Sequence, residues 1–362
     1  MNITESAEVT ELRGVLRRLL LRDAAADSPV IRRSPRVWDT LTQEIGLLEV
    51  FADPGALDAI GEAMLASVLC EEIGRALAPA PLAGTIVALG VLRRCQPATD
   101  DIVSSIVSDH RTAGVALADR AINLEPGIKA STGAEGWHAS GEAALAMTAD
   151  QADVLVVPAA SEAGVVLLAI DTSHPSVRVI ARPTLDGTRA FADLVLETTP
   201  ARLIADAGAA STMVDFAYDR TALLLAAEAL GGARHCLEIT LTHVKQRSQF
   251  GRPIGSFQAV KHRLADHAVA IEATASLVAL AAAIADDPDA DPAQISVAAS
   301  VAKAHSSETF TAVAGDSIQL HGGIGFTWEH QAHRYFKRAH VTARYWGSAA
   351  SHRARIASIM GW

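Results

Sequence analysis

The strongest constraint on the fold of this chain is the long helical periodicity that follows Met213. Apolar side chains there recur every three or four residues, which is the spacing of a helix that buries one face. The first such stripe consists of Leu223, Leu230, Leu237, Leu241 and Val244. Two more helices are predicted from Phe257 to Asp286 and from Pro292 to Gln319, separated by an Asp- and Pro-rich turn. Because long helices with short links are typical of a bundle, residues 212–362 are predicted to form a C-terminal helical bundle domain.

Two further domains are predicted upstream of this bundle. Residues 1–109 have helical periodicity, with Ala63–Leu77 as a long apolar pattern, and are expected to form an N-terminal α-helical domain. Residues 110–211 contain short β-prone runs separated by Gly, Pro, Asp and Ser, which predicts a middle β domain. These runs are Val154–Val157, Val165–Ile170 and Leu194–Leu196. The predicted fold class is therefore α+β, and its 362 residues exceed what one small core needs.

Charge and cysteine content argue against several classes of protein. Acidic residues outnumber basic ones by 41 to 31, and the basic residues are scattered, which argues against nucleic-acid binding. The three cysteines have no CxxC spacing, so neither a disulfide framework nor a zinc site is indicated. The N-terminus is charged, and the longest apolar runs, around Leu277–Ala285, are too short to cross a bilayer. A soluble, cytoplasmic protein is expected.

One segment at the end of the first predicted bundle helix suits a phosphate-bearing ligand. It is RSQFGRPIGSFQ, residues 247–258. Arg247, Gln249 and Phe250 place a guanidinium, an amide and an aromatic face at one helix end, which suits a phosphate beside an adenine. Taken alone, the segment is equally well explained as a helix stop.

A second segment, QLHGGIGF at residues 319–326, ends the third predicted bundle helix. Glycines at positions such as Gly322 and Gly323 let a ligand approach the backbone closely, and the Gln319 side chain supplies both a donor and an acceptor. Taken alone, this segment is equally well explained as a tight turn. The presence of both segments makes a ligand site the better interpretation.

Both segments, in this order and spacing, resemble signature segments of the acyl-CoA dehydrogenase family, and Glu71–Arg75 matches its first helical domain. The resemblance implies an N-terminal helical domain, a middle β-barrel-like domain and a C-terminal four-helix bundle, with FAD as cofactor. In the family, the matching residues reach across a subunit interface to the adenosine and diphosphate of an FAD whose flavin lies in the neighbouring protomer. The cofactor-binding residues implied here are Arg247, Gln249, Phe250, Gln319, Gly322 and Gly323.

The resemblance fails at the catalytic base. Family members remove the α proton of an acyl-CoA with a Glu carboxylate while hydride passes from the β carbon to the flavin. At the two places where members carry that Glu, this chain has Trp346 and Thr221. Asp219 and Glu228 lie near the second place, but a two-residue slip turns a helical side chain by about 200°. A solvated or capping Asp219 and an ordinary helical Glu228 are favoured, so no catalytic residue is predicted in this chain.

The segments that hold the flavin ring in active members are also altered. Where the family has a Thr-Glu-Pro segment, this chain has residues 116–122, ALADRAI, and where a later segment carries an aromatic wall and a hydroxyl it has Ala144–Thr148. The losses therefore fall on the flavin side and on the base, while the adenosine side is retained.

That pattern resembles the heteromeric acyl-CoA dehydrogenases of actinobacterial sterol side-chain degradation, in which two family members form an α2β2 tetramer. The resemblance implies a non-catalytic subunit that completes the FAD site of a homologous catalytic partner acting on a bulky acyl-CoA. Two alternatives are a self-sufficient homotetramer that uses Asp219 or Glu228 as a displaced base, and a purely structural paralogue that touches no cofactor. A flavin-dependent monooxygenase component is a weaker alternative, because it would need a flavin pocket of its own.

Several histidines gather in the last predicted helices. They are His305, His321, His330, His333 and His340. Their spacing has neither an HExxH motif nor a paired-carboxylate frame, so solvated or interface histidines are expected and no metal site is predicted.

Overall fold

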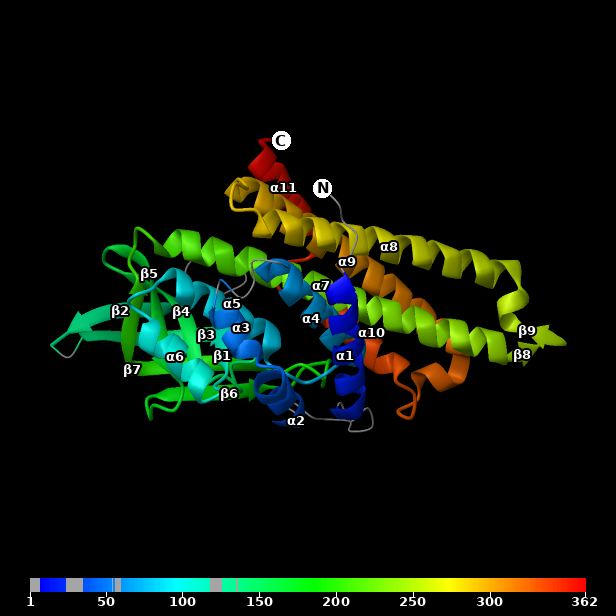
Figure 1. Ribbon diagram of the computed structural model, residues 1–362, viewed down its shortest axis with the longest axis horizontal. Coiled ribbons are helices and arrows are strands. Elements are labelled where there is room, and N and C mark those ends of the chain that lie inside the picture. The colour runs from blue at the N-terminus through cyan, green and yellow to red at the C-terminus, as the bar shows by residue number, and fades with distance from the viewer. Residues whose placement is uncertain (1–6, 24–34, 54, 56–59, 118–125, 135) are drawn as a thin grey trace. The chain divides into compact units, whose positions relative to one another are not determined.

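The computed structural model describes residues 7–362 apart from 24–34, 54, 56–59, 118–125 and 135 (Figure 1). Helices, then strands, then long helices follow one another along the chain, which confirms the α+β class. The chain divides into two compact units. The bundle unit contains Met1–Asp27, Ala63–Ala78 and Ala222–Trp362, and the sheet unit contains Ser28–Glu62 and Pro79–Thr221. The division into three domains at residues 109 and 211 stays a prediction.

The bundle unit is built mainly from long helices, and α9 packs against α8, α10 and α11. Figure 1 shows the β8–β9 hairpin where the chain passes from α7 to α8. Helix α9 begins at Pro292, as predicted, and the Asp291 side chain caps it by accepting a hydrogen bond from the Ala293 amide. The elements are α1 (Ala7–Asp23), α4 (Glu62–Ala76), α7 (Ala210–Gln246), β8 (Ser248–Gln249), β9 (Arg252–Pro253), η3 (Ile254–Ser256), α8 (Gln258–Asp286), α9 (Pro292–His321), η4 (Gly322–Phe326), α10 (Ala332–Thr342) and α11 (Ala349–Met360). The two helices predicted from Phe257 to Asp286 and from Pro292 to Gln319 are α8 and α9, and each predicted end lies within two residues of the observed one.

A close helix crossing in the bundle unit joins α4 to α7 at two glycines. A Cβ on Gly74 would lie 2.0 Å from the Glu228 carbonyl oxygen, and a Cβ on Gly231 would lie 1.9 Å from the Glu71 carbonyl oxygen. At both positions the nearest atom is a backbone carbonyl oxygen, so no flexible side chain can move aside to make room for a Cβ. The two helices therefore approach at a distance that only glycine permits.

Buried ion pairs hold the same helices together. Glu71 and Glu72 are 4% and 1% exposed, although carboxylates are seldom buried without a partner. Arg13 of α1 lies 2.7 Å from Glu71, and Arg17 of α1 lies 2.8 Å from Glu72. Arg234 of α7 lies 2.5 Å from Glu71. These cations compensate the buried carboxylates and fasten α1 and α7 to α4.

The sheet unit contains a closed ring of strands. The sheet order is β1-β4-β2-β3-β7-β5, and β4 also pairs with β5, so β4, β2, β3, β7 and β5 form a closed circuit. This topology confirms the predicted β-barrel-like domain. Alternate residues along these strands face the core. Leu155 and Val157 of β4 pack there in one cluster with Leu168 and Ile170 of β5. The elements are α2 (Pro35–Asp39), η1 (Thr40–Glu44), α3 (Leu47–Ala52), α5 (Leu82–Arg94), α6 (Asp100–Ser108), β1 (Ala113–Val115), β2 (Ile128–Gly133), β3 (Gly136–Met147), β4 (Val154–Ser161), β5 (Gly164–Asp171), β6 (Val177–Arg182) and β7 (Phe191–Ala205).

Helix α8 leaves much of its apolar surface uncovered. Among the described residues, it is the one helix long and apolar enough to cross a membrane by length and composition. A single helix of this kind is weak evidence for a membrane span, and only 28% of the apolar stretch is buried within the chain. Val269 is 71% exposed, and Ala265, Ala268 and Ala273 are exposed as well.

Replacing Gly231 by alanine is expected to lower the melting temperature, although alanine normally stabilises a helix relative to glycine by about 1 kcal/mol. The added methyl group must push α4 and α7 apart, and overpacking of this kind costs about 1–3 kcal/mol or more. Thermal unfolding followed by circular dichroism measures the effect. Gly315→Ala in α9 is the control, since its Cβ would meet only the Phe336 ring at 3.9 Å, and it is expected to be neutral or stabilising. Equal melting temperatures for Gly231→Ala and wild type would contradict the close crossing.

Candidate cofactor-contact site

The predicted segment 247–258 forms a β-hairpin directly after α7. Ser248 pairs with Pro253 and Gln249 pairs with Arg252, so Phe250 and Gly251 form a two-residue turn. Their φ angles are +53° and +76°, as the turns favoured in tight hairpins require. A positive φ is unusual for an aromatic residue, and the Phe250 side chain is 92% exposed. The hairpin therefore presents an aromatic ring to the surroundings of the chain.

The hairpin belongs to a region of concentrated positive charge, residues 239–265, which we call the positive tip. This region contains no Asp or Glu in a chain of net charge −10. Its cations are Lys245, Arg247, Arg252, Lys261 and Arg263. Arg252 lies over the Phe257 ring at 4.1 Å, and Arg263 pairs with Asp316 of α9 at 3.2 Å. In the described part of the chain, the side chains of Arg247, Lys245 and Lys261 form no ion pair, so the tip has positive charge to offer an anion.

The predicted glycine-rich segment follows the last turn of α9. Gly322 has φ +66° and ψ −144°, a conformation that favours glycine, and its amide donates to the carbonyls of Gln319 and Ile318. A Cβ at Gly322 or Gly323 would meet no atom within 4 Å, and the Gln319 side chain is exposed. The segment is therefore open to a ligand.

Histidine rings connect this segment to the positive tip. The rings of His243 in α7 and His321 in α9 lie 4.4 Å apart, and those of His321 and His330 lie 4.3 Å apart. Arg247 follows His243 by one helical turn, and Gly322 follows His321 directly. The structure therefore brings the two motif segments to the same end of the bundle unit.

The sequence interpretation of the histidines needs correction. His321 and His333 are 7% and 8% exposed, so they are buried within the chain instead of solvated. His305 lies 2.9 Å from the Thr274 hydroxyl, and the His340 ring packs on Phe336 at 4.3 Å. Within the described residues, no group of three His, Cys, Asp or Glu side chains is arranged to hold a metal ion.

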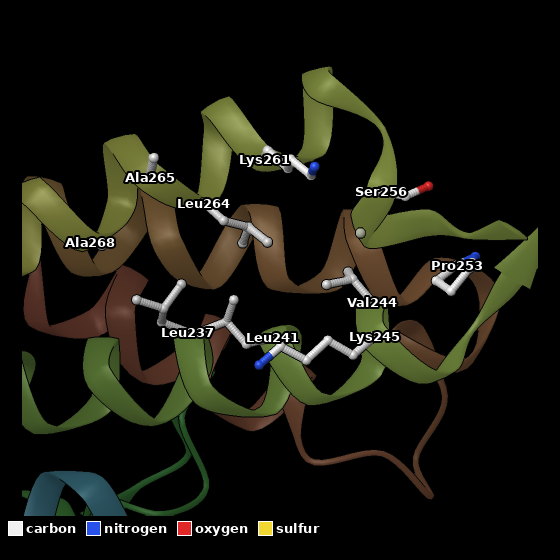
Figure 2. A pocket seen from close by; sticks show the side chains of 11 residues that line it. Leu237, Leu241, Val244, Lys245, Pro253, Ser256, Lys261, Leu264, Ala265 and Ala268 are labelled. Atoms are coloured by element: carbon white, nitrogen blue, oxygen red, sulfur yellow. The ribbon is translucent and has the colours of Figure 1, made fainter.

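An apolar groove of about 540 Å³ lies beside the hairpin, between α7 and α8. Figure 2 shows Leu237, Leu241 and Val244 of α7 across the groove from Leu264 of α8. Its only charged lining residues are Lys245 and Lys261. The other lining residues are Pro253, Gly255, Ser256, Ala265 and Ala268. Its volume lies in the range of small-molecule sites, and its chemistry suits an apolar group next to an anion.

The segment around Trp346, where the resemblance places a catalytic Glu, is fixed by two buried side chains. Trp346 is 2% exposed and has φ +64°. The His352 ring donates from Nε2 to the Trp346 carbonyl at 2.8 Å. Lys303, which is fully buried, donates from Nζ to the carbonyls of Thr342 at 2.9 Å and Gly347 at 3.3 Å. Helical periodicity in the sequence did not predict this arrangement. The available sequence signal for a buried, hydrogen-bonded ammonium group was a lysine in the apolar centre of α9.

The candidate displaced bases have ordinary structural surroundings. Glu228 is 8% exposed and forms a buried ion pair with Arg338 of α10. Removing a proton from substrate would require this carboxylate to leave its guanidinium partner. Asp219 and Thr221 are each 5% exposed and lie in the first part of α7, up to Thr221, which belongs to the sheet unit. An ordinary structural role for Glu228 stays a prediction. The expectation of a solvated or capping Asp219 is wrong, because this residue is buried and lies inside α7.

The altered flavin-side segments lie in the sheet unit. Ala116 and Leu117 are buried, and residues 118–122 of that segment lie outside the described residues. The Thr148 hydroxyl is buried and donates to its neighbour, the Met147 carbonyl, at 2.7 Å. Leu145 is 51% exposed, with φ +53°.

Comparison with known proteins decides the family. Residues 206–361 match the model described as acyl-CoA dehydrogenase, C-terminal domain. Acyl-CoA dehydrogenase IpdE2 of Mycobacterium tuberculosis is 34% identical over 85% of this chain and 81% of its own length. The chain belongs to the acyl-CoA dehydrogenase family. IpdE2 of Mycolicibacterium smegmatis is also 34% identical, over 86% of this chain and 84% of its own. Acyl-CoA dehydrogenases are FAD-dependent oxidoreductases, which confirms the cofactor and the reaction class expected from the sequence.

Solved acyl-CoA dehydrogenase structures share the fold along the whole chain. A variant of the Tcur3481–Tcur3483 steroid acyl-CoA dehydrogenase has a TM-score of 0.84 and 29% identity, covering 98% of both chains. The ChsE4–ChsE5 complex from Mycobacterium tuberculosis has a TM-score of 0.87 and covers 100% of this chain and 99% of that one. At 24% identity, the second comparison shows the fold alone.

The pH dependence of stability tests the buried contacts around Trp346. Burial, and then the charge of Lys303, lower the pKa of His352 from 6.5 to about 4. The unfolded chain therefore takes up this proton below about pH 6.5, while the folded chain resists it until about pH 4. Stability is expected to fall by on the order of 3 kcal/mol as the pH decreases across that window.

Urea unfolding at several pH values measures this slope, and His352→Gln is the control. Its amide can still donate to the Trp346 carbonyl but does not titrate, so its profile between pH 6.5 and 4 is expected to be flatter. Identical slopes for the two proteins would mean that His352 is not the group responsible.

Proposed function

We propose that this chain is the non-catalytic, cofactor-completing subunit of a heteromeric FAD-dependent acyl-CoA dehydrogenase. It contacts the adenosine and diphosphate of an FAD, while a homologous catalytic partner holds the flavin end. The observation that carries this proposal is the positive tip, which contains no Asp or Glu and has Arg247 three residues before the exposed Phe250. The His243–His321 contact brings the tip and the open glycine segment to the same end of the bundle unit. The contact residues are Arg247, Gln249, Phe250, Gln319, Gly322 and Gly323.

The chemistry of these side chains fits one end of a dinucleotide. The Arg247 guanidinium is a planar fork that donates two parallel hydrogen bonds to phosphate oxygens. The exposed Phe250 ring offers a face on which an adenine can stack. The open surface at Gly323 allows the diphosphate to approach the backbone. Gln319 and Gln249 add amide donors and acceptors that can bind hydroxyl groups of the ribose.

The same chain offers no base in the expected places. FAD supplies a hydride acceptor when bound, but the reaction also needs a carboxylate near the α carbon of the acyl group. Trp346 has no basic group, and the Glu228 carboxylate is paired with Arg338. These observations favour a partner that performs the proton transfer over a self-sufficient homotetramer with a displaced base.

The uncovered face of α8 supports an assembly with other subunits. Val269 and the exposed alanines of α8 are small or compact, so another helix can pack closely against them. We assign this face to subunit contact and not to a membrane. A homologous partner is supported by the Tcur3481–Tcur3483 relative, whose name joins two proteins. A bulky, steroid-type acyl-CoA is supported by the name of the Tcur3481–Tcur3483 relative.

Flavin content tests the division of labour. The chain expressed alone is expected to be poorly soluble or free of flavin, because the α8 face would remain exposed. Co-expressed with a homologous acyl-CoA dehydrogenase encoded nearby, it is expected to form a heteromer with one FAD for every two chains. Absorbance at the flavin band, together with the protein mass of the complex, measures this ratio. A stable yellow homotetramer of this chain would overturn the proposal.

The substitution Arg247→Ala tests the diphosphate contact within the assembled complex. Loss of a charged hydrogen-bonding partner of a phosphate costs about 1.5–3 kcal/mol, so FAD affinity is expected to fall about tenfold or more. Assembly should persist, and excess FAD should restore activity. Arg247→Lys is expected to recover only part of the affinity, because a point charge cannot replace the planar fork.

Fluorescence titration of the flavin-stripped complex with FAD measures these affinities. Arg263→Ala is the matched control, since Arg263 belongs to the same tip but is already paired with Asp316. Its FAD affinity should equal that of the unmodified complex. Full affinity in Arg247→Ala would make Arg247 an ordinary helix-end residue.

A further inference from the structure

Three imidazole rings contact one another in series beside the positive tip. His243 of α7, His321 of α9 and His330 of the segment before α10 have ring centroids 4.4 and 4.3 Å apart in that order. The central ring is 7% exposed, while the two outer rings are partly exposed. His321 Nδ1 lies 2.7 Å from the Ser317 carbonyl, to which it can only donate, so its tautomer is fixed. We call these three residues the histidine stack.

We propose that the histidine stack is a proton-accepting anion contact, which takes up a proton from solvent when the diphosphate of a dinucleotide binds at Arg247. The inference rests on the proposed function, because it names a second contact of the same ligand. His243 lies one turn before Arg247 on α7, and His321 immediately precedes Gly322. Two of the three rings are therefore attached to the backbone segments assigned to the diphosphate.

The surroundings keep the outer rings neutral in the free chain. Burial, and then the neighbouring His321, lower the pKa of both His243 and His330. Arg247 acts in the same direction on His243, and His333 of α10 acts in the same direction on His330. Glu329, next to His330 in sequence, is turned toward Thr327, whose hydrogen bond lowers the pKa of that carboxyl.

A bound diphosphate reverses this balance. Its negative charges favour the imidazolium form of a nearby ring, so the pKa of an outer histidine rises on binding. The proton comes from solvent to a ring nitrogen, and no covalent bond to the ligand forms. Affinity is then linked to pH and should increase as the pH falls from about 8 toward 6, by at most about tenfold per unit for each proton taken up.

Calorimetry of the flavin-stripped complex with ADP-ribose tests this link without flavin and without turnover. The diphosphate of ADP-ribose is a diester, so the ligand itself does not titrate near neutral pH. Titrations in two buffers of different ionisation enthalpy give the number of protons taken up per ligand. The variants are the double substitution His243→Gln with His330→Gln, and Arg247→Ala. His340→Gln is the matched control, since His340 is also partly exposed but packs on Phe336, outside the stack.

Wild type and His340→Gln are expected to take up a proton near pH 6.5, and the double variant is expected to bind without proton uptake and with a flat pH profile. If wild type binds without proton uptake while Arg247→Ala still weakens binding, the histidine stack is excluded and the proposed function stands. If ADP-ribose does not bind, or binds equally well to Arg247→Ala, the diphosphate contact itself is wrong and the inference fails with it. Unchanged proton uptake in the double variant would also overturn the inference.

Discussion

The bundle unit depends on how closely α4 and α7 approach at Gly74 and Gly231. Any Cβ at these positions would collide with backbone oxygens, so the separation of the two helices is set by atoms that cannot move aside. The buried carboxylates of Glu71 and Glu72 lie on the same stretch of α4, and Arg13, Arg17 and Arg234 neutralise them. Close contact and charge compensation therefore act at one place. From this crossing α7 continues as one helix to its end at Gln246, so the crossing also fixes the position of the positive tip in the bundle unit.

Much of the fold was predictable because its signals are local. Helical periodicity placed α8 and α9 to within two residues, since each has an apolar pattern that is bounded by Pro or by Asp-rich turns. The hairpin at Phe250 and the glycine conformation at Gly322 follow from residues adjacent in sequence. The histidine stack was not predictable in this way, because His243, His321 and His330 meet only after three elements have packed. The burial of Lys303 was hidden for the same reason, since its two carbonyl acceptors belong to residues about forty positions away.

The two halves of the expected active site differ in how much substitution they tolerate. A diphosphate contact needs a few side chains at an exposed helix end, such as that of Arg247. The region of the base is different, because Trp346 is buried and its backbone is held by His352 and Lys303. A carboxylate at that position would be placed among groups selected to enclose an indole. Placing a working carboxylate at position 346 would therefore require changes to the whole support of the segment, beyond the one side chain.

The exposed apolar face of α8 also has a consequence for the cell that makes this chain. In the proposed heteromer, a protomer that finds no partner would present the same kind of surface that chaperones and proteases recognise in unfolded proteins. Surplus copies would be removed or would associate wrongly, so the abundance of the chain would follow that of its partner. Balanced synthesis of the two subunits, most simply by translation from one messenger RNA, would then be a requirement imposed by a single helix surface.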